Sequence, residues 1–566
     1  MAERFLDRFC RSDFSSYEEF YREYRVTYPE NFNFGYDVVD ELAARTPDKT
    51  ALVWCNDQGD ERILTFADVK RGSDAYAWVL RGLGIGRGDA VMVMLKRRYE
   101  YWLFAVAAAK VGALLIPATH MLTAKDVKYR VQAADIKMIL TINNERLCGE
   151  IDGAQKDCGE ILRVKAVLSG EREGYVSFGR LAEAAEGKPW KRPAGAEAID
   201  SRGIMLAYFT SGTTGMPKIV AHDFFYPLSH ITTAAFWHDL RPDDLHLTVA
   251  DTGWAKAAWG KIYGQWICEA ALFVYDYDAN FHPSDFLDLV DKYQITSFCA
   301  PPTIYRFLIK EDLSRFSLKS LRKCTTAGEP LNPEVYQQWL KATDIRLREG
   351  FGQTESTILA AVTPWVEPRP GSMGKPMPGV CCGIYDETGR PCDPGEEGEL
   401  CVPVPDEKNF PLGIFRGYYR DPEVTGSVVF DGLYHTGDIA WKDEDGYFWF
   451  KGRGDDIIKC SGYRIGPFEV ESALLEHPAV LETAITGVPD PVRGLNVKAT
   501  IVLTEGYEPS EALKKELQDH VKRVTAPYKY PRVIEFVDEL PKTISGKIRR
   551  KEIRTNDAKA AEENQS

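Results

Sequence analysis

Strand-like and helix-like segments alternate along most of this chain, and the alternation restricts the fold more than any other feature. Thr50–Cys55 is an apolar run typical of a strand. Thr65 and Asp68 have the spacing of a capping box, which predicts a helix running towards Leu83. Ala90–Leu95 follows as a candidate buried strand. This order predicts an α/β fold in which helices cover mainly parallel sheets.

Length and composition indicate an ordinary protein of more than one domain. At 566 residues the chain is too long for a single hydrophobic core, so we expect two or more domains, at least one of them large. A hydrophobic content of 44% and a charged content of 27% are typical of globular proteins. The net charge of −14 argues against a nucleic-acid partner.

Three features bear on the compartment. Met1–Phe14 carries acidic side chains and no apolar segment, so we expect no signal peptide. The apolar run Trp102–Pro117 is interrupted by Lys110 and is too short to span a membrane, and we interpret it as a buried helix. The 12 cysteines are scattered without a C-x-x-C pair, which argues against a zinc site or a disulfide framework. Together these features predict a cytoplasmic protein with reduced thiols.

The sequence changes character near Lys451–Asp456, where we place a domain boundary. Beyond it, Pro467 suits the first turn of a helix. Val497–Thr504 and Val533–Val537 are typical of strands. Apolar residues at helical spacing lie between these strands, at Leu513, Leu517 and Val521. These elements predict a small α+β domain at the C-terminal end.

Thr210–Lys218, which reads TSGTTGMPK, has the composition of a phosphate-binding loop. Its glycines let backbone N–H groups converge on an anion, and its hydroxyls and lysine add further donors. It is not a Walker loop, because Met216 and Pro217 separate the last glycine from Lys218. A flexible surface turn is the alternative interpretation, but the strand-like segment Ile204–Phe209 before the loop favours phosphate binding.

Four further segments carry candidate chemistry, and each is weak alone. Glu349–Glu355 (EGFGQTE) ends in a possible metal carboxylate, and Tyr434–Asp438 (YHTGD) ends in a carboxylate suited to a ribose diol. Arg453–Arg464 (RGDDIIKCSGYR) leads into IGPFEVE. Pro541–Lys547 (PKTISGK) ends in a lysine of a kind that is usually just exposed.

The five segments in this order resemble the adenylate-forming enzymes, which include acyl-CoA synthetases, peptide-synthetase adenylation domains and firefly luciferase. The resemblance extends from about residue 35 to residue 554. DTGW at Asp251–Trp254, PDPVRG at Pro489–Gly494 and TAPYKYPR at Thr525–Arg532 resemble the medium-chain acyl-CoA synthetase branch. The resemblance implies an N-terminal ATP- and acyl-binding domain (1–453) of helix-covered, mostly parallel sheets with a smaller β subdomain. It also implies a hinge (454–456) and a small mobile α+β domain (457–566).

The same resemblance implies residue roles for ATP. Lys547 would bridge the acid and the α-phosphate, Thr354 would bind the α-phosphate, and Glu355 would hold Mg²⁺. Asp438 would grip the ribose, supported by Arg453. The implied ATP- and AMP-binding residues are Thr210, Ser211, Gly212, Thr213, Thr214, Gly215, Lys218, Gly328, Glu329, Pro330, Glu349, Gly350, Phe351, Gly352, Gln353, Asp438, Arg453 and Arg464.

A second set of residues is implied for CoA. The small domain would swing on Asp455 after the first half-reaction, so that Lys547 leaves and the thiol enters. The implied CoA-binding residues are Ser461, Gly462, Tyr463, Arg493, Lys522, Tyr530 and Arg532.

The acyl pocket is expected to involve Trp237, Trp254, Lys256, Trp259 and Gly352. Acetate-specific members of the family carry a tryptophan where this chain has Gly352, so we expect a pocket for more than two carbons. Lys256 would shorten the pocket or meet a polar substrate if it points inward. It would face solvent if it continues a helix, where it lies about 200° from Trp254, and this second interpretation is the simpler one.

The resemblance thus implies an AMP-forming acyl-CoA synthetase that uses ATP, CoA and Mg²⁺ and acts on a short-to-medium-chain or branched acid. The alternatives are a stand-alone adenylation enzyme that loads a carrier protein, a luciferase-like oxygenase, and a non-enzymatic nucleotide-binding regulator. We expect no nucleic-acid partner and no membrane span, and either a monomer or a homodimer.

Overall fold

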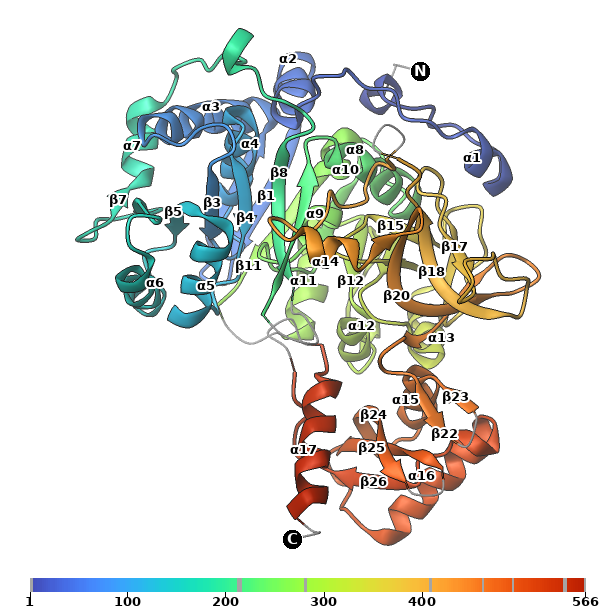
Figure 1. The fold of residues 1–566 in the computed structure, drawn as a ribbon. Coiled ribbons are helices and arrows are strands. Elements are labelled where there is room, and N and C mark those ends of the chain that lie inside the picture. The colour runs from blue at the N-terminus through green and yellow to red at the C-terminus, as the bar shows by residue number, and fades with distance from the viewer. Residues whose placement is uncertain are drawn as a thin grey trace.

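The computed structural model describes residues 4–210, 216–278, 282–406, 410–460, 463–490, 493–542 and 547–563. Their strands form three sheets. A large N-terminal body contains two of the sheets, and a C-terminal lobe, which runs from β22 to α17, contains the third (Figure 1). The predicted α/β class, with a large N-terminal and a small C-terminal domain, is confirmed.

The longest sheet joins a parallel half to an antiparallel half. Strands β10 to β14 and β1 pair in parallel, whereas the strands beyond β14 pair antiparallel and form the smaller β subdomain. In spatial order the sheet contains β17 Gly383–Tyr385, β18 Glu397–Pro403, β20 Leu433–Lys442, β21 Phe448–Arg453, β16 Ser372–Pro376, β15 Ile358–Ala361, β14 Leu347–Gly352, β13 Lys323–Thr326, β12 Ser297–Ala300, β10 Leu245–Thr248, β11 Ala271–Asp276, β1 Thr50–Asn56 and β2 Glu61–Thr65, with β19 Val429–Phe430 on β20.

The second sheet is buried on both faces. Along β3, Val91 and Val93 face the helices α3, α4 and α7, whereas Met92 and Met94 face α5 and α6, as the two-residue period of a strand requires. In spatial order this sheet contains β7 Val176–Ser177, β6 Val164–Val167, β5 Ile136–Thr141, β3 Ala90–Met94, β4 Leu114–Pro117, β8 Ile204–Thr210 and β9 Lys218–Asp223.

The α-helices cover these sheets on both sides (Figure 1). They are α1 Tyr17–Glu23, α2 Glu41–Arg45, α3 Phe66–Gly82, α4 Glu100–Val111, α5 Ala124–Ala134, α6 Glu145–Cys158, α7 Phe178–Ala185, α8 Tyr226–Ile231, α9 Lys256–Gly260, α10 Tyr263–Ile267, α11 Pro283–Tyr293, α12 Pro302–Leu308, α13 Pro333–Thr343, α14 Pro422–Gly426, α15 Pro467–Leu475, α16 Glu511–Val524 and α17 Arg550–Glu563. A π-helical turn, η4 Thr232–Trp237, extends α8. Among the described residues, no helix combines the length and the apolar character needed to cross a membrane.

One element prediction is wrong in part. The run Trp102–Pro117 is not a single helix, because α4 ends at Val111, Gly112 caps it, and the strand β4 follows. Gly112 has a φ of 78°, a left-handed conformation that ends helices and that glycine adopts at little cost. The residues after it pair with β3, where Val93 lies opposite Pro117. An apolar run alone could not distinguish a buried helix from a buried strand here.

The C-terminal lobe has its own core beneath a five-stranded sheet. The sheet contains β23 Tyr463–Ile465, β22 Ile458–Cys460, β25 Gly494–Leu503 and β24 Val480–Asp490, with β26 Val533–Phe536 on β25. Leu513, Leu517 and Val521 of α16 are buried against it, as their spacing predicts. Helix α17 runs along one side of the lobe, beside β24 (Figure 1).

Ion pairs connect α17 to the segment that joins the lobe to the body. Residues 454–456 form a turn between β21 and β22. An Arg554 Nη1 lies 2.5 Å from Asp456 Oδ1, and an Arg550 Nη1 lies 3.9 Å from Asp456 Oδ2. Arg550 also pairs with Glu471 of α15 at 2.7 Å. The helix that follows Lys547 is therefore attached to the last residue of the connecting turn.

Candidate active site

A cavity of about 1680 Å³ lies where the N-terminal body meets the C-terminal lobe. The residues that follow the parallel strands β10, β12, β13 and β14 line it, at Val249, Pro301, Ala327 and Gln353. Ligands of open α/β sheets bind outside the carboxyl ends of their strands, and this cavity has that position. The lobe contributes Lys547 to the same wall.

Most residues predicted to bind nucleotide line this cavity: Thr210, Lys218, Gly328, Glu329, Pro330, Glu349, Gly350, Phe351, Gly352, Gln353, Thr354, Glu355, Asp438 and Arg453. Arg464 does not line the cavity, and its Nη1 lies 3.7 Å from Glu387 Oε1. Ser211, Gly212, Thr213, Thr214 and Gly215 fall outside the described residues. The structure therefore brings together segments that are far apart in the sequence. The centre of the glycine-rich loop is not among the residues that it describes.

Gln353 connects the loop after β14 to the turn in β20. Its Nε2 donates to the Thr436 carbonyl at 2.9 Å and to Asp438 Oδ2 at 2.5 Å, and its Oε1 accepts from the Tyr434 hydroxyl at 2.5 Å. Arg453 Nη1 donates to the Thr436 carbonyl at 2.8 Å and to Asp438 Oδ1 at 3.2 Å. Asp438 is thus held from two sides.

Asp438 is 4% exposed, and burial raises the pKa of its carboxyl to about 6, although Arg453, Gln353 and Lys547 all lower it. Arg453 also restricts the turn, since a Cβ on Gly437 would lie 2.7 Å from Arg453 Nη2. The φ of Gly437 is 74°, which also favours glycine. The turn therefore presents a carboxylate whose charge changes near pH 6.

Glu355 and Thr354 follow β14, and each accepts a hydrogen bond from a residue of another segment. Glu355 Oε1 accepts from the Tyr418 hydroxyl at 3.0 Å, and Lys218 Nζ lies 4.7 Å from the Tyr418 ring centroid. Burial lowers the pKa of His222 to about 4, so its neutral ring donates from Nε2 to the Thr354 carbonyl at 2.9 Å. One carboxylate beside a hydroxyl fits Mg²⁺, which uses few protein ligands when it also binds substrate phosphates.

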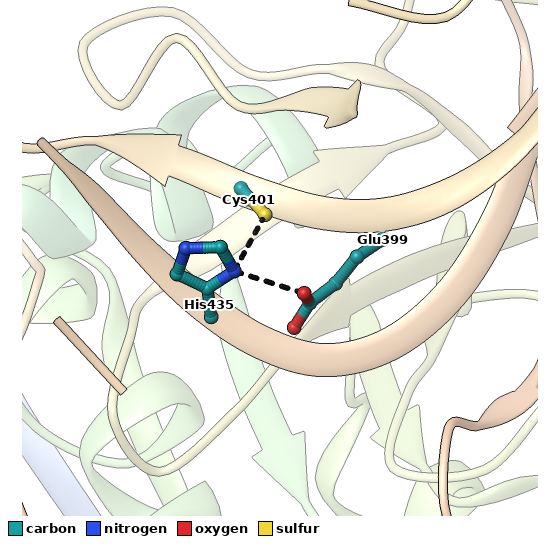
Figure 2. Close-up of side chains that lie close together, drawn as sticks. All are labelled: Glu399, Cys401 and His435. Carbon is teal, nitrogen blue, oxygen red and sulfur yellow. Dashed lines mark hydrogen bonds and ion pairs between the residues drawn. The ribbon is translucent and has the colours of Figure 1, made fainter. Parts of the chain in front are cut away.

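A carboxylate, a thiol and an imidazole lie together at Glu399, Cys401 and His435 (Figure 2). Glu399 and His435 line the cavity. His435 Nδ1 is 2.9 Å from Glu399 Oε2 and 3.6 Å from Cys401 Sγ, and Glu399 Oε1 accepts from the Gly437 N–H at 2.7 Å. Such a group could hold a metal ion. Burial raises the pKa of the Cys401 thiol. The hydrogen bond from the Gly437 N–H shows that Glu399 also positions the Gly437–Asp438 turn.

The acyl-pocket candidates divide into two layers. Trp254, Lys256, Trp259 and Gly352 line the cavity. Trp237 is 1% exposed and lies behind the wall, with its ring 6.4 Å from that of Trp259. A Cβ on Gly350 would lie 2.6 Å from Trp237 Cε2, and a Cβ on Gly352 would lie 2.4 Å from Trp259 Cη2. The space beside Gly352 is therefore filled by Trp259 and is not an opening in the pocket.

The solvent-facing interpretation of Lys256 is wrong. Helix α9 begins at Lys256, so Trp254 precedes the helix and the helical angle between them does not apply. Lys256 Nζ donates to the Ala327 carbonyl at 2.7 Å and lines the cavity. The ammonium group therefore points inward.

Those residues predicted to bind CoA that the structure describes, Tyr463, Arg493, Lys522, Tyr530 and Arg532, belong to the lobe and do not line the cavity. Tyr530 is flanked by two cations, with Lys522 Nζ at 4.3 Å and Arg532 Cζ at 4.6 Å from its ring centroid. Tyr463 is 51% exposed and stacks on Tyr528. Arg493 Nη1 lies 4.0 Å from Asp490 Oδ1. Ser461 and Gly462 are outside the described residues.

Comparison with known proteins identifies the family. Residues 39–419 match the model of the AMP-binding enzyme family, and residues 469–547 match its C-terminal domain. The chain belongs to the AMP-binding enzyme family.

Family relatives match over nearly the whole chain. The mitochondrial acyl-coenzyme A synthetase ACSM3 of Mus musculus is 41% identical over 96% of this chain and 93% of its own length. The mitochondrial acyl-coenzyme A synthetase ACSM4 of Homo sapiens is 43% identical over 93% of this chain and 90% of its own length. The relationship to the medium-chain branch, stated from sequence motifs, is confirmed.

Solved structures of the same family share the fold. The anthranilate CoA ligase AuaEII, in complex with anthranoyl-AMP, aligns with a TM-score of 0.84 and 28% identity, covering 94% of this chain and 99% of its own. The Brucella canis acyl-CoA synthetase aligns with a TM-score of 0.72 and 30% identity, covering 97% of this chain and 100% of its own.

Within this AMP-binding enzyme, the sequence interpretation missed several supporting residues. Glu399, His222 and Tyr418 hold the turns that carry Asp438, Thr354 and Glu355. Each belongs to a strand or loop remote in sequence from the residue that it supports. Because their roles arise only from tertiary contact, no local pattern identified them.

Proposed function

We propose that this chain is an AMP-forming acyl-CoA synthetase that activates a short-to-medium-chain or branched carboxylic acid. The observation that carries the proposal is that Lys547 of the lobe lines the same cavity as Thr354, Glu355 and Asp438. Its charge acts on the Asp438 carboxyl there, where it lowers the pKa. The residues to which we assign the acid, the α-phosphate and the ribose thus line one cavity.

The first half-reaction joins two anions, since the acid carboxylate must attack the α-phosphorus of ATP. At about 4 Å, two like charges repel by roughly 4 kcal/mol at an effective dielectric constant near 20. Lys547 would lie between the carboxylate and the α-phosphate and offset this repulsion, and it would stabilise charge that develops in the transition state. Thr354 would donate its hydroxyl to the α-phosphate.

Further residues would hold the rest of ATP. Lys218 would bind the departing phosphates, Asp438 would accept from the ribose hydroxyls, and Gly328–Pro330 would lie along the adenine. Glu355 would hold Mg²⁺, which supplies positive charge to the pyrophosphate leaving group.

The second half-reaction transfers the acyl group from AMP to the thiol of CoA. We propose that the lobe turns about Asp455, which removes Lys547 from the cavity and brings Tyr463 beside the thiol path. Lys522, Tyr530 and Arg532 form a cationic and aromatic cluster, to which we assign the nucleotide part of CoA. Arg493, Ser461 and Gly462 complete the proposed CoA set, and Arg464 is proposed to reach phosphate in one of the two arrangements.

The deciding experiment measures AMP release with ATP and CoA across straight and branched acids of two to ten carbons. Lys547→Ala should lower acid-dependent ATP–pyrophosphate exchange by more than about 100-fold, because one electrostatic contact to the transition state is lost. The same variant should still form the thioester from supplied acyl-adenylate at a nearly wild-type rate. Equal loss of both half-reactions would contradict this division of labour.

Two other functions are distinguished by the same assay. An enzyme that loads a carrier protein would release AMP with pantetheinylated protein and not with free CoA. A nucleotide-binding regulator would release no pyrophosphate with any acid. A cytoplasmic location remains a prediction, since the relatives above are named mitochondrial, and imaging of a fluorescent fusion tests it.

A further inference from the structure

Lys256 places an ammonium group inside the cavity. Its Nζ donates to the Ala327 carbonyl at 2.7 Å, and a Cβ on Gly328 would lie 3.9 Å from it. An ammonium group has three donor hydrogens, so this contact leaves two. The group therefore lies between α9 and the loop after β13, with donors remaining for a ligand.

Within the described residues, no carboxylate lies within 4.0 Å of Lys256 Nζ. Glu329 is the acidic residue whose charge acts on it, but the Glu329 carboxylate accepts from the Thr303 N–H at 2.7 Å and from the Thr303 hydroxyl. Burial lowers the pKa of Lys256, as expected for an ammonium group without an adjacent counter-ion. The Lys256 side chain is half-buried. A charge that is partly removed from water without a counter-ion is costly, and an anionic ligand would offset that cost.

A second cation, Lys547, and the aromatic side chain of Trp259 line the same cavity as Lys256. Lys547 lines the same cavity, and its charge also lowers the pKa of Lys256. Trp259 lies three residues after Lys256, so the two side chains share one face of α9. Trp259 fills the space beside Gly352 and thereby limits the length of an acid in this pocket.

We propose that the acid substrate carries a second anionic group close to the carboxylate that reacts, and that Lys256 binds this second group. The inference rests on the proposed function, in which Lys547 serves the reacting carboxylate. The substrate class is a compact dicarboxylic acid or an acid with a comparable oxyanion. Lys256 selects it by charge, and Trp259 selects it by length.

The test compares each monocarboxylic acid of three to six carbons with the dicarboxylic acid of the same length. The readout is kcat/KM for CoA-dependent AMP formation. The wild-type enzyme should prefer the dicarboxylic acid at one or more lengths by about tenfold or more. Lys256→Met should lower kcat/KM for that acid by roughly 30-fold or more, because the second carboxylate loses its partner. The ratio of kcat/KM for the dicarboxylic acid to kcat/KM for the matched monocarboxylic acid should therefore fall by about tenfold or more, and Lys256→Arg should restore part of this ratio.

Lys261→Met is the matched control. Lys261 is buried, it lines the cavity as Lys256 does, and its Nζ donates to a backbone carbonyl, that of Ala250, at 2.8 Å. In this control variant, kcat/KM should change by the same factor for both acids of a pair. If Lys256→Met does not fold, Lys256→Gln replaces it, and the wild-type preference is decisive by itself.

Two results would overturn the inference. One is a wild-type preference for the monocarboxylic acid at every length. The other is an equal loss of kcat/KM for both acids in Lys256→Met, which would mean that Lys256 binds the reacting carboxylate. Absence of AMP with every acid would instead contradict the proposed function.

Discussion

Asp438 shows how a single buried residue links the fold to binding. Its carboxylate lies between Arg453 and Gln353, in a strand that presents it to the cavity. Desolvation exceeds the effect of these partners, so the pKa rises to about 6. Because the pKa is raised, the group is ionised above pH 6 and neutral below it. Nucleotide binding should therefore depend on pH near this value.

We expect the KM for ATP to rise roughly tenfold per pH unit below about pH 6, because a neutral carboxyl is a weaker acceptor for the ribose hydroxyls. The measurement is initial velocity against ATP concentration from pH 5 to pH 8. Asp438→Asn is the control, since ATP itself titrates in this range. The variant should bind ATP weakly, with a shallower pH dependence. A wild-type profile parallel to that of the variant would contradict the assignment.

At the scale of elements, the acyl pocket depends on how a strand and two helical segments fit together. Gly350 and Gly352 are two residues apart on β14 and so face the same side. The missing side chains make room for Trp237 from η4 and Trp259 from α9, whose rings meet nearly edge to face. We therefore expect Trp259 to limit the length of the pocket, although Gly352 is the residue that the family resemblance indicated.

Trp259→Ala should lengthen the pocket. We expect kcat/KM for eight-carbon acids to rise relative to three-carbon acids by roughly tenfold or more, since each added methylene gains contact in the space that the indole leaves. The measurement is AMP formation across the acid series. Trp237→Ala is the control: it should destabilise the fold by about 3–5 kcal/mol while leaving the length preference unchanged. An unchanged preference in Trp259→Ala would disprove the role of this residue.

Elements could be predicted where local pattern and tertiary context agree. The helix begun by Pro467 and the buried face of α16 follow from residue type and spacing alone. The division of the Trp102–Pro117 run and the inward turn of Lys256 could not be predicted, because each depends on where a helix ends or begins. The pairing of Gly352 with Trp259 joins residues almost a hundred positions apart, which no local pattern contains.

At the scale of the whole molecule, the proposed chemistry needs two arrangements of the lobe. In the present arrangement Lys547 lines the cavity together with Thr354 and Asp438. The proposed CoA cluster around Tyr530 lies elsewhere on the lobe. A rotation about the turn 454–456 would exchange these two surfaces, and the predicted hinge residue, Asp455, lies in that turn.

Asp455→Pro should separate the half-reactions, because proline fixes φ and restricts rotation at this position. We expect acid-dependent ATP–pyrophosphate exchange at a wild-type level, whereas thioester formation is lost. Asp455→Ala, which leaves φ free, is the control and should retain both. Rapid-quench measurement of acyl-adenylate and acyl-CoA distinguishes the steps. Thioester formation at the wild-type rate in Asp455→Pro would rule out a hinge at this residue.

The ion pairs between α17 and Asp456 determine how a rotation of the lobe would move Lys547. Arg550 and Arg554 anchor the helix to the residue next to the pivot, and Lys547 stands three positions before that helix. If the lobe turns about Asp455, Lys547 should therefore move together with this turn. A small torsional change there would carry the ammonium group over a long distance, without any change in how the body and the lobe are packed inside.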